Sequence, residues 1–404
     1  MSKILLLENP HTSADETFNR YGMEVVRVPG SLDEDDLIEA LQGFDMVGIR
    51  SKTNLTERVM ENSPQLQLIG TFSIGTNQID LDAAAKRGIP VFNAPYSNTR
   101  SVVEMVIAEL ISLYRHLPEH NARLQRGDWQ KSAAGSREVR GKTLGIIGYG
   151  SIGSQLSVVA EALGMTVIFY DVAEKLAIGN AQRAKSLDEL LAVSDVVSLH
   201  IDGRPANKGF FSRDMFNKMK KGSVFINLAR GQVADLDALR EKLLDGSIIG
   251  AGIDVYPTEP KKNGDEFTSV LRSVPNVILT PHVGGSTLEA QEDIGHYVSN
   301  KLMNYWRKGE TEMSVNIPNL GGAPSTDVLH RIGWIHRNTP GALARVNHLF
   351  AQAGANITYQ SLATEGEYGY MVTDLSSEIP PQTLDELRAS EAHIRLRVLD
   401  RPNA

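Results

Sequence analysis

Three glycines in the segment GIIGYGSIGSQ (residues 145–155) constrain the fold of this chain more than any other feature. Gly148, Gly150 and Gly153 form the pattern G-x-G-x-x-G, which follows the apolar run TLGII and precedes a helical pattern that ends at Gly164. A glycine motif between a strand and a helix is typical of a βαβ unit whose helix begins at the motif. The sequence therefore predicts an α/β domain with a parallel sheet in this region.

The same glycines predict an anion site. Gly148 permits a tight turn, Gly150 lets a pyrophosphate approach the main chain, and Gly153 lets helix and strand pack closely. The next strand pattern, MTVIFYD, ends in Asp171, at the spacing of a carboxylate that binds a ribose hydroxyl. Because this carboxylate would repel a 2′-phosphate, NAD is favoured over NADP. The alternative is a glycine-rich turn with a structural role only.

Length and composition indicate a globular protein of several domains. A chain of 404 residues exceeds one compact core, so two or three domains are expected. The net charge of −8 disfavours a nucleic-acid or anionic-membrane surface, so an anionic substrate would need a local cationic pocket. The chain has no cysteine, no transmembrane run and no signal-peptide pattern, which predicts a cytoplasmic location and gives no cysteine metal site.

Alternating strand and helix patterns divide the chain into domains. Short β-rich runs such as KILLLEN, EVVRV and IPVFNAP alternate with helical stretches over residues 1–98, which predicts a doubly wound, flavodoxin-like parallel sheet. A second alternating series over residues 99–282 predicts a Rossmann domain that binds NAD. The helical pattern after it is long enough to return to the first sheet. Residues 1–98 and 283–318 are therefore expected to form one discontinuous substrate-binding domain.

The last part of the chain follows a different pattern. Residues 319–329 are rich in Gly, Pro and Ser and lack periodicity, which predicts a linker. Residues 330–404 show two helical stretches, the first between Pro340 and Gly354, among four strand patterns. The order βαββαβ predicts a small ferredoxin-like module.

Three segments at predicted strand ends carry candidate catalytic groups. They are INLARGQVAD around Arg230, GIDVYPTEP around Glu259 and ILTPHVGGST around His282. Parallel strands hold ligands at their carboxyl edge, so these loops could converge on a nicotinamide. A neutral histidine can take the hydroxyl proton during oxidation of an alcohol, a carboxylate can stabilise the imidazolium, and an arginine can bind a substrate carboxylate. Each residue alone could be structural or merely exposed, and their joint placement favours a 2-hydroxy acid substrate.

These motifs resemble those of a known family. The glycine motif, NLARG, DVYPTEP and TPHVGGST are similar to those of D-isomer-specific 2-hydroxyacid dehydrogenases over nearly all of residues 1–318. RSKT, SIGTNQID and NAPYSNTRSVVEM, with the appended module, more closely resemble the bacterial D-3-phosphoglycerate dehydrogenase branch of that family. The resemblance implies NAD-dependent oxidation of 3-phospho-D-glycerate (3-phosphoglycerate) to 3-phosphohydroxypyruvate, the first step of L-serine biosynthesis. It also implies a homotetramer.

The resemblance further implies which residues form the site. The implied catalytic residues are Arg230, Glu259 and His282. The implied cofactor contacts are Gly148, Gly150, Ser151, Ile152, Gly153, Asp171, Leu228, Ala229, Arg230, Asp254, His282, Val283, Gly284 and Gly285. The implied substrate contacts are Arg50, Ser51, Lys52, Gly75 and Asn98, with Lys131 reaching a neighbouring subunit's site. For the basic residues among them, a solvated surface charge is the alternative.

The C-terminal module resembles an ACT domain, a regulatory module that binds amino acids where two copies pair. The resemblance implies that L-serine, as an allosteric effector, contacts His336, Asn338 and Asn356. The alternative is that Asn338 caps a helix and Asn356 lies in a turn. The segment STDVLHRI lacks the paired glycines of close relatives, and the linker has its pair earlier, at Gly321-Gly322, which leaves the hinge position open.

Two other functions remain open at this point. Within the family, the substrate could be 2-oxoglutarate, glyoxylate or hydroxypyruvate, which would need less or differently placed positive charge around Arg50 and Lys52. Outside enzymes, the chain could be a non-catalytic NAD-sensing scaffold. The joint presence of Arg230, Glu259 and His282 argues against a scaffold, which has no need of a base, its carboxylate partner and a carboxylate clamp.

Overall fold

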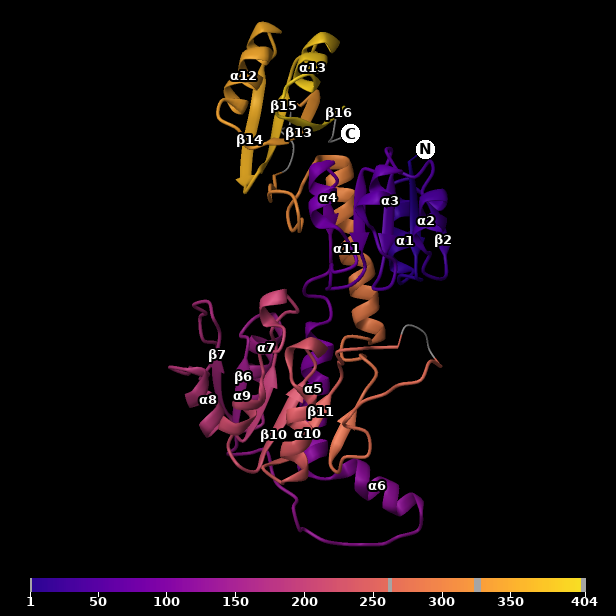
Figure 1. Ribbon diagram of the computed structural model, residues 1–404. Coiled ribbons are helices and arrows are strands. Elements are labelled where there is room, and N and C mark those ends of the chain that lie inside the picture. Colours follow the sequence, from indigo (N-terminus) through magenta and orange to yellow (C-terminus); the bar gives the residue numbers. More distant parts are fainter. Residues whose placement is uncertain (1, 261–263, 323–327, 401–404) are drawn as a thin grey trace. The chain divides into compact units, whose positions relative to one another are not determined.

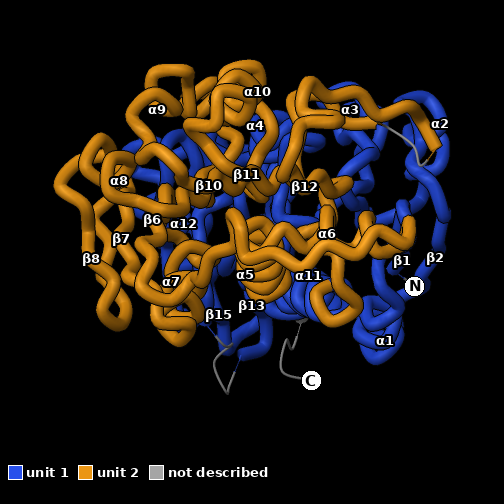
Figure 2. Tube along the Cα trace, turned by 90° about the horizontal axis from the view of Figure 1, so that it is seen from below, with its two compact units in different colours: residues 1–97, 291–404 blue, residues 98–290 orange. Residues whose placement is uncertain are grey.

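The structure is a computed structural model that describes residues 2–260, 264–322 and 328–400 (Figure 1). Contacts between Cα atoms divide the chain into two compact units, residues 1–97 with 291–404 and residues 98–290 (Figure 2). Strands in the described residues form three sheets, two in the first unit and one in the second. No helix in the described part of the chain has the length and apolar character needed to cross a membrane.

The first sheet of unit 1 has five parallel strands in the order β2-β1-β3-β4-β5. The strands are β1 (Lys3–Leu7), β2 (Glu24–Val28), β3 (Met46–Ile49), β4 (Leu68–Thr71) and β5 (Val91–Phe92). The helices between them are α1 (Ser13–Arg20), α2 (Glu34–Ala40), α3 (Glu57–Glu61) and α4 (Leu81–Lys86). Strands β3 and β4 are buried along their whole length, as expected of parallel strands covered on both faces.

Unit 2 contains a seven-stranded parallel sheet in the order β12-β11-β10-β9-β6-β7-β8. The strands are β6 (Thr143–Ile147), β7 (Thr166–Tyr170), β8 (Gln182–Arg183), β9 (Val196–Leu199), β10 (Ser223–Asn227), β11 (Ile248–Ile253) and β12 (Val277–Leu279). The helices are α5 (Thr99–Tyr114), α6 (Leu117–Gln125), α7 (Ser151–Ala162), α8 (Leu187–Val193), α9 (Arg213–Lys218) and α10 (Leu236–Leu244). The strand order reverses direction between β6 and β9, which is where doubly wound sheets bind nucleotides.

The 21-residue helix α11 (Leu288–Lys308) follows the last strand of the seven-stranded sheet. After it comes an antiparallel sheet in the order β14-β15-β13-β16. Its strands are β13 (His330–Arg337), β14 (Ile357–Glu365), β15 (Tyr368–Leu375) and β16 (His393–Asp400), and its helices are α12 (Ala342–Gln352) and α13 (Pro381–Arg388). The chain order is βαββαβ.

Arginines of the antiparallel sheet satisfy carbonyl groups at the C-terminal end of α11, within unit 1. Arg331 is buried and donates to Lys308 O at 2.9 Å, and Arg397 donates to Tyr305 O and Trp306 O at 3.0 and 2.9 Å. The last carbonyls of a helix have no partner in the helix and carry partial negative charge, so guanidinium groups stabilise this end. The sheet is thereby attached to the helix that follows the seven-stranded sheet.

The predicted fold class is confirmed: two doubly wound parallel sheets and a C-terminal βαββαβ module. The sequence patterns did not predict the short edge strand β8 or the helix α6, which has no buried residue. The predicted domain limits (1–98 with 283–318, 99–282, and 330–404) stay a prediction. Of the predicted linker, residues 323–327 lie outside the described residues.

Candidate active site

The predicted cofactor and catalytic residues of unit 2 follow the strands of its sheet at their carboxyl ends. The glycine motif follows β6, Asp171 follows β7, Leu228 to Arg230 follow β10, Asp254 follows β11, and His282 lies three residues beyond β12. Since all seven strands are parallel, these ends share one edge of the sheet. The structure therefore brings together residues that lie more than 100 positions apart in the chain.

The geometry of the glycine motif leaves room for a ligand at one position only. Gly148 has a φ of 94°, and a Cβ there would lie 2.5 Å from His200 O. A Cβ at Gly153 would collide with the carbonyl oxygen of Gly148. At Gly150, the residue before α7, a Cβ would meet no atom within 4 Å. Two glycines are thus required by packing, and the third leaves the main chain open beside the first turn of α7, which fits a dinucleotide pyrophosphate.

Asp171 is oriented toward the glycine motif. Its Oδ2 accepts a hydrogen bond from Tyr149 N at 2.8 Å, and its Oδ1 accepts one from Ala173 N at 2.9 Å. The carboxylate therefore lies beside the turn that would hold the pyrophosphate. This is the place expected for a group that binds the ribose of NAD.

His282 and Glu259 form a hydrogen-bonded pair. His282 Nδ1 lies 2.9 Å from Glu259 Oε2, and both side chains are partly exposed. This hydrogen bond, more than any other cause, raises the pKa of His282, while burial acts in the opposite direction. Burial alone would raise the pKa of Glu259. The hydrogen bond with His282 and the charge of the protonated imidazole outweigh burial, so the pKa of Glu259 is lowered. The pair can therefore hold a proton on the imidazole.

The backbone of His282 is unusual for a residue with a side chain. Its φ is 56°, in the left-handed region, which non-glycine residues seldom occupy. Asp254 holds the loop in this shape: its carboxylate accepts from Thr280 Oγ1 at 2.6 Å, Val283 N at 2.9 Å and Gly284 N at 2.8 Å. Asp254 is 1% exposed. Its observed contacts are thus with the loop that presents His282.

Arg230 reaches the same edge through a close contact between two loops. A Cβ at Gly231 would collide with the main chain of Tyr256, so this glycine lets the loop after β10 lie directly against the loop after β11. Tyr256 N in turn donates to Glu259 Oε1 at 3.2 Å. Burial lowers the pKa of Arg230, and the charge of Glu259 acts in the opposite direction. Arg230 and Glu259 are therefore electrostatic neighbours.

Two groups of unit 2, Glu109 and His200, were not predicted. Glu109, on α5, is 4% exposed, and a Cβ at Gly252 would collide with its Oε2. Neither carboxylate oxygen of Glu109 has a hydrogen-bond partner among the described residues. His200 follows β9 and shares a hydrogen bond of 2.9 Å with Ser198. Its position after an apolar strand was a signal for His200, whereas Glu109 reads as an ordinary helix residue.

The predicted substrate residues of unit 1 lie at the carboxyl edge of the five-stranded sheet. Arg50, Ser51 and Lys52 follow β3, and Gly75 lies in the loop after β4. Arg50 Nη2 donates to Gln291 Oε1 at 2.8 Å. Ser51 and Lys52 are exposed.

The other two predicted substrate residues belong to unit 2. Asn98 packs against Gly285, and its Oδ1 is buried with no hydrogen-bond partner among the described residues. Lys131 is exposed and lines a hollow of about 420 Å³ with Leu124 and Trp129, residues at and just after the C-terminal end of α6. Asn98 therefore lies beside the loop of His282, and Lys131 lies in a different part of the unit.

The predicted effector residues do not meet within one chain. His336 is buried, its ring stacks on Trp334 with centroids 4.4 Å apart, and burial lowers its pKa. Asn338 follows the same strand and donates to Gly366 O at 3.1 Å. Asn356 precedes β14 at the other end of the sheet, where its Nδ2 donates to Ser376 Oγ at 2.8 Å. A single ligand that contacts all three residues would have to lie between two chains.

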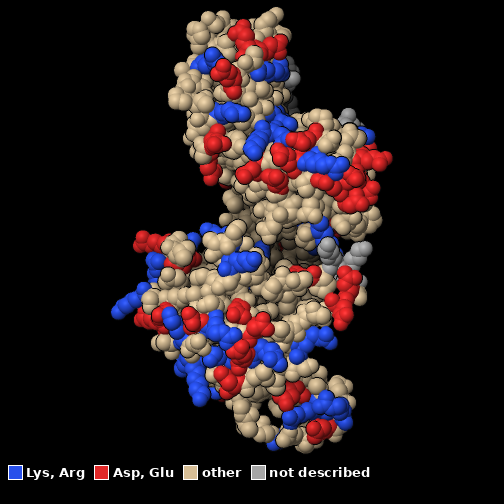
Figure 3. All heavy atoms as spheres, viewed as in Figure 1, with Lys and Arg blue, Asp and Glu red and all other residues tan. Residues whose placement is uncertain are grey.

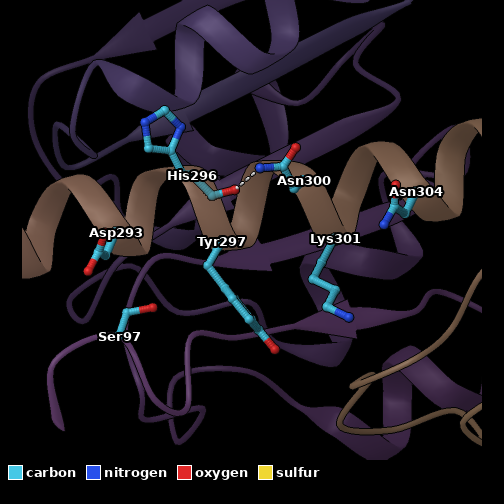
Figure 4. Close-up of a pocket in the computed structure, with 7 residues that line it drawn as sticks. All are labelled: Ser97, Asp293, His296, Tyr297, Asn300, Lys301 and Asn304. Atoms are coloured by element: carbon cyan, nitrogen blue, oxygen red, sulfur yellow. Dashed lines mark hydrogen bonds between the residues drawn. The ribbon is translucent and has the colours of Figure 1, made fainter.

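A polar hollow of about 360 Å³ on α11 contains none of the predicted site residues. It is lined by Ser97 and by side chains from successive turns of the helix (Figure 4). Lys301 pairs with Glu312 at 3.0 Å, and Asn300 Nδ2 donates to His296 O at 2.7 Å. Because Lys301 and Asn300 are already bonded within the unit, we assign no ligand to the hollow. On the face of the molecule in Figure 3, basic and acidic side chains are interspersed.

Comparisons with known proteins identify the family and the domains of this chain. A family model described as the NAD-binding domain of D-isomer-specific 2-hydroxyacid dehydrogenases matches residues 107–284. An ACT domain model of the acetohydroxyacid synthase (AHAS) small-subunit type matches residues 332–391. The D-3-phosphoglycerate dehydrogenase of Haemophilus influenzae is 48% identical over 398 residues, covering 98% of this chain and 97% of its own.

The chain belongs to the D-3-phosphoglycerate dehydrogenase family. The Escherichia coli K12 relative of that name is also 48% identical, over 98% of this chain and 97% of its own length. The Saccharomyces cerevisiae relative is 45% identical, over 98% of this chain and 87% of its own length. Among solved structures, D-2-hydroxyisocaproate dehydrogenase has a TM-score of 0.71 at 27% identity, covering 78% of this chain and 99% of its own. An Aquifex aeolicus D-lactate dehydrogenase, solved with NAD and lactic acid, has a TM-score of 0.65 at 28% identity, covering 75% of this chain and 95% of its own.

Membership in this family makes the chain an NAD-dependent oxidoreductase. The predicted NAD cofactor and the predicted ACT module are confirmed. The open main chain at Gly150 and the position of the Asp171 carboxylate fit the nucleotide site of doubly wound NAD domains, and the individual cofactor contacts stay predictions.

Proposed function

We propose that the chain oxidises 3-phospho-D-glycerate to 3-phosphohydroxypyruvate with NAD, as the first step of L-serine biosynthesis. The observation that carries the proposal is the hydrogen bond between His282 Nδ1 and Glu259 Oε2, at the sheet edge that also holds Arg230 and the glycine motif. The full-length relatives support the choice of substrate, since three of them bear the name D-3-phosphoglycerate dehydrogenase or D-3-phosphoglycerate dehydrogenase 1. A cytoplasmic location is part of the proposal.

His282 would act as the general base. Its Nδ1 is bonded to Glu259, which leaves Nε2 to take the proton of the substrate C2 hydroxyl. Glu259 would hold the ring in this orientation and stabilise the imidazolium that forms. NAD, when bound, supplies the hydride acceptor for C2. In the reverse direction the protonated His282 would return its proton to the carbonyl oxygen.

The anionic groups of the substrate call for cationic side chains. Arg230 offers a planar fork of N–H donors, which can bind the C1 carboxylate in a bidentate manner. The phosphate is assigned to the side chains of Arg50, Ser51 and Lys52, and Gly75 and Asn98 are proposed as further substrate contacts. Lys131 is proposed to reach the site of a neighbouring subunit, as its exposed position beside α6 allows.

We also propose feedback inhibition by L-serine in a homotetramer. The separation of Asn356 from His336 and Asn338 along the sheet supports a ligand that bridges two ACT modules. A bridging ligand would favour one arrangement of the subunits and so change the activity of the enzyme.

One assay tests the proposed reaction. NADH consumption is measured with 3-phosphohydroxypyruvate, 2-oxoglutarate and glyoxylate side by side, with and without millimolar L-serine. We expect the highest kcat/KM with 3-phosphohydroxypyruvate and a lower rate with serine. A higher kcat/KM for either of the other two acids would contradict the proposed substrate, and an unchanged rate with serine would contradict the feedback.

A substitution tests the assigned base. His282→Gln should lower kcat about 10²- to 10⁴-fold, the usual contribution of a general base, and leave NADH binding intact. His348→Gln, at an exposed position on α12, is the control and should leave turnover unchanged. Full activity of His282→Gln would remove the assignment.

A further inference from the structure

The carboxylate of Glu8 occupies a main-chain anion site at the end of β3. The backbone N–H groups of Arg50, Ser51, Lys52 and Thr53 donate to it at 3.3, 3.0, 3.0 and 2.8 Å. Several successive N–H groups that point at one spot form a concavity which binds phosphates or carboxylates in many proteins. Here the bound anion is a side chain of the same unit.

Glu8 is fixed in this position by its own backbone. It follows β1 directly, and its φ is 65°, a left-handed conformation that is uncommon for a residue with a side chain. Its N–H donates to Val28 O and Gly30 O at 3.1 and 3.2 Å. Strand β1 is buried almost throughout, so the carboxylate is held from a rigid element.

The loop that Glu8 holds is also tied to the loop after β4. The carbonyl oxygen of Arg50 accepts from Thr71 Oγ1 at 3.2 Å and from Gln78 Nε2. Gln78 Nε2 in addition lies 3.3 Å from the carbonyl oxygen of Gly75. The two segments to which substrate contacts are assigned, residues 50–52 and residue 75, are therefore joined by one hydrogen-bond network.

This arrangement divides the groups after β3 into two sets. The main-chain donors of residues 50–53 are engaged with Glu8, so a ligand can meet only side chains there. The guanidinium of Arg50 is already held by Gln291, and the side chains of Ser51 and Lys52 are exposed. We propose that Glu8 is a positioning residue that holds this loop so that the side chains of Arg50, Ser51 and Lys52 converge on the phosphate of the substrate. The inference rests on the proposed function.

A positioning role and a simple charge effect predict opposite results. If Glu8 acted only as a nearby negative charge, its neutralisation would strengthen the binding of an anionic substrate. If it holds the loop, neutralisation weakens that binding, because an amide at residue 8 would present N–H donors to N–H donors. The sign of the change in KM therefore separates the two.

The test compares two substrates that differ only in the phosphate. With the full-length Glu8→Gln protein and NADH, we expect KM for 3-phosphohydroxypyruvate to rise about tenfold, with kcat changed less than twofold. KM for hydroxypyruvate should change less than twofold. Glu16→Gln, at an exposed acidic position in the first turn of α1, is the control and should leave both values unchanged.

Each other outcome has a defined meaning. A lower or unchanged KM for 3-phosphohydroxypyruvate, or an equal rise for both substrates, overturns the positioning role. A wild-type enzyme without preference for the phosphorylated substrate overturns the proposed substrate itself, and with it the phosphate role of Glu8. Should Glu8→Gln not fold, Glu8→Asp keeps the charge on a side chain one methylene shorter. The same selective rise in KM is expected of it, and its absence overturns the proposal.

Discussion

Replacing Glu109 by glutamine should change how the stability of the protein depends on pH. Burial, with the charge of Asp254 as the second cause, raises the pKa of Glu109 from an ordinary 4.5 to about 8. The unfolded chain exposes this carboxyl group and restores its ordinary pKa. Between pH 4.5 and 8 the folded protein therefore binds more protons at this site than the unfolded chain, and the free energy of unfolding falls as pH rises.

The size of this effect follows from the shift. One pKa unit corresponds to about 1.4 kcal/mol, so the raised pKa costs the folded protein about 5 kcal/mol above pH 8 and almost nothing below pH 4.5. Glutamine has nearly the same shape and does not titrate in this range. The free energy of unfolding of Glu109→Gln minus that of the wild type should therefore rise by about 3 kcal/mol between pH 5.5 and 8 and level off above that.

Urea unfolding followed by circular dichroism at several pH values between 5.5 and 9 measures this difference. Glu104→Gln is the matched control, because Glu104 lies on the same helix but is 60% exposed and pairs with Arg100 at the surface. Its difference from the wild type should vary by less than about 0.5 kcal/mol over this range, as surface pairs contribute little. A difference for Glu109→Gln that is independent of pH would refute the reasoning, and so would an equal pH dependence in the control.

Three further predictions concern unit 2. Gly231→Ala should lower kcat/KM at least tenfold, because a Cβ there collides with the main chain of Tyr256, and should change the affinity for NADH little. Steady-state kinetics measure kcat/KM, and a fluorescence titration measures NADH binding. Asp171→Ala should raise the Kd of NADH about tenfold and leave kcat at saturating NADH within threefold, and an unchanged Kd in the same titration would contradict the ribose role. Glu259→Gln should move the acidic limb of the pH profile of kcat/KM for oxidation to lower pH. The substitution removes the partner that raises the pKa of His282, so the imidazole stays neutral to lower pH. An acidic limb at the same pH as in the wild type would contradict this.

The order of elements in the fold could be predicted because each carries its own local signal. The motif after β6 has glycines where packing forbids a side chain, and the strands of both parallel sheets read as short apolar runs between helical patterns. The strand β8 and the helix α6 were missed for the same reason. Strand β8 has two residues, both exposed, and α6 buries none, so neither has an apolar pattern to detect.

The site could be predicted only in part, because residues with long-range partners look ordinary in the sequence. Glu8 follows an apolar strand, but nothing in KILLLEN indicates that its carboxylate accepts four main-chain N–H groups more than 40 residues away. The sequence likewise gives no indication of why Gly231 and Gly252 are glycines. Gly231 is required by its contact with Tyr256, and Gly252 by its contact with Glu109, both in other segments of the chain. The sequence thus predicted the loops that carry the candidate residues, and the residues that hold those loops in place emerged only from their contacts in the structure.

The geometry of the ACT module makes the proposed serine site and the proposed oligomer a single hypothesis. In the antiparallel sheet His336 pairs with Gly369 of β15, whereas Ile357, next to Asn356, pairs with Leu375. Six residues of strand separate these positions, which corresponds to about 20 Å, several times the length of a serine molecule. A variant that holds the chain as a monomer should therefore lose both serine binding and inhibition. Calorimetric titration of serine into such a monomer would show no heat of binding, and retained binding would mean that the three residues do not share one ligand.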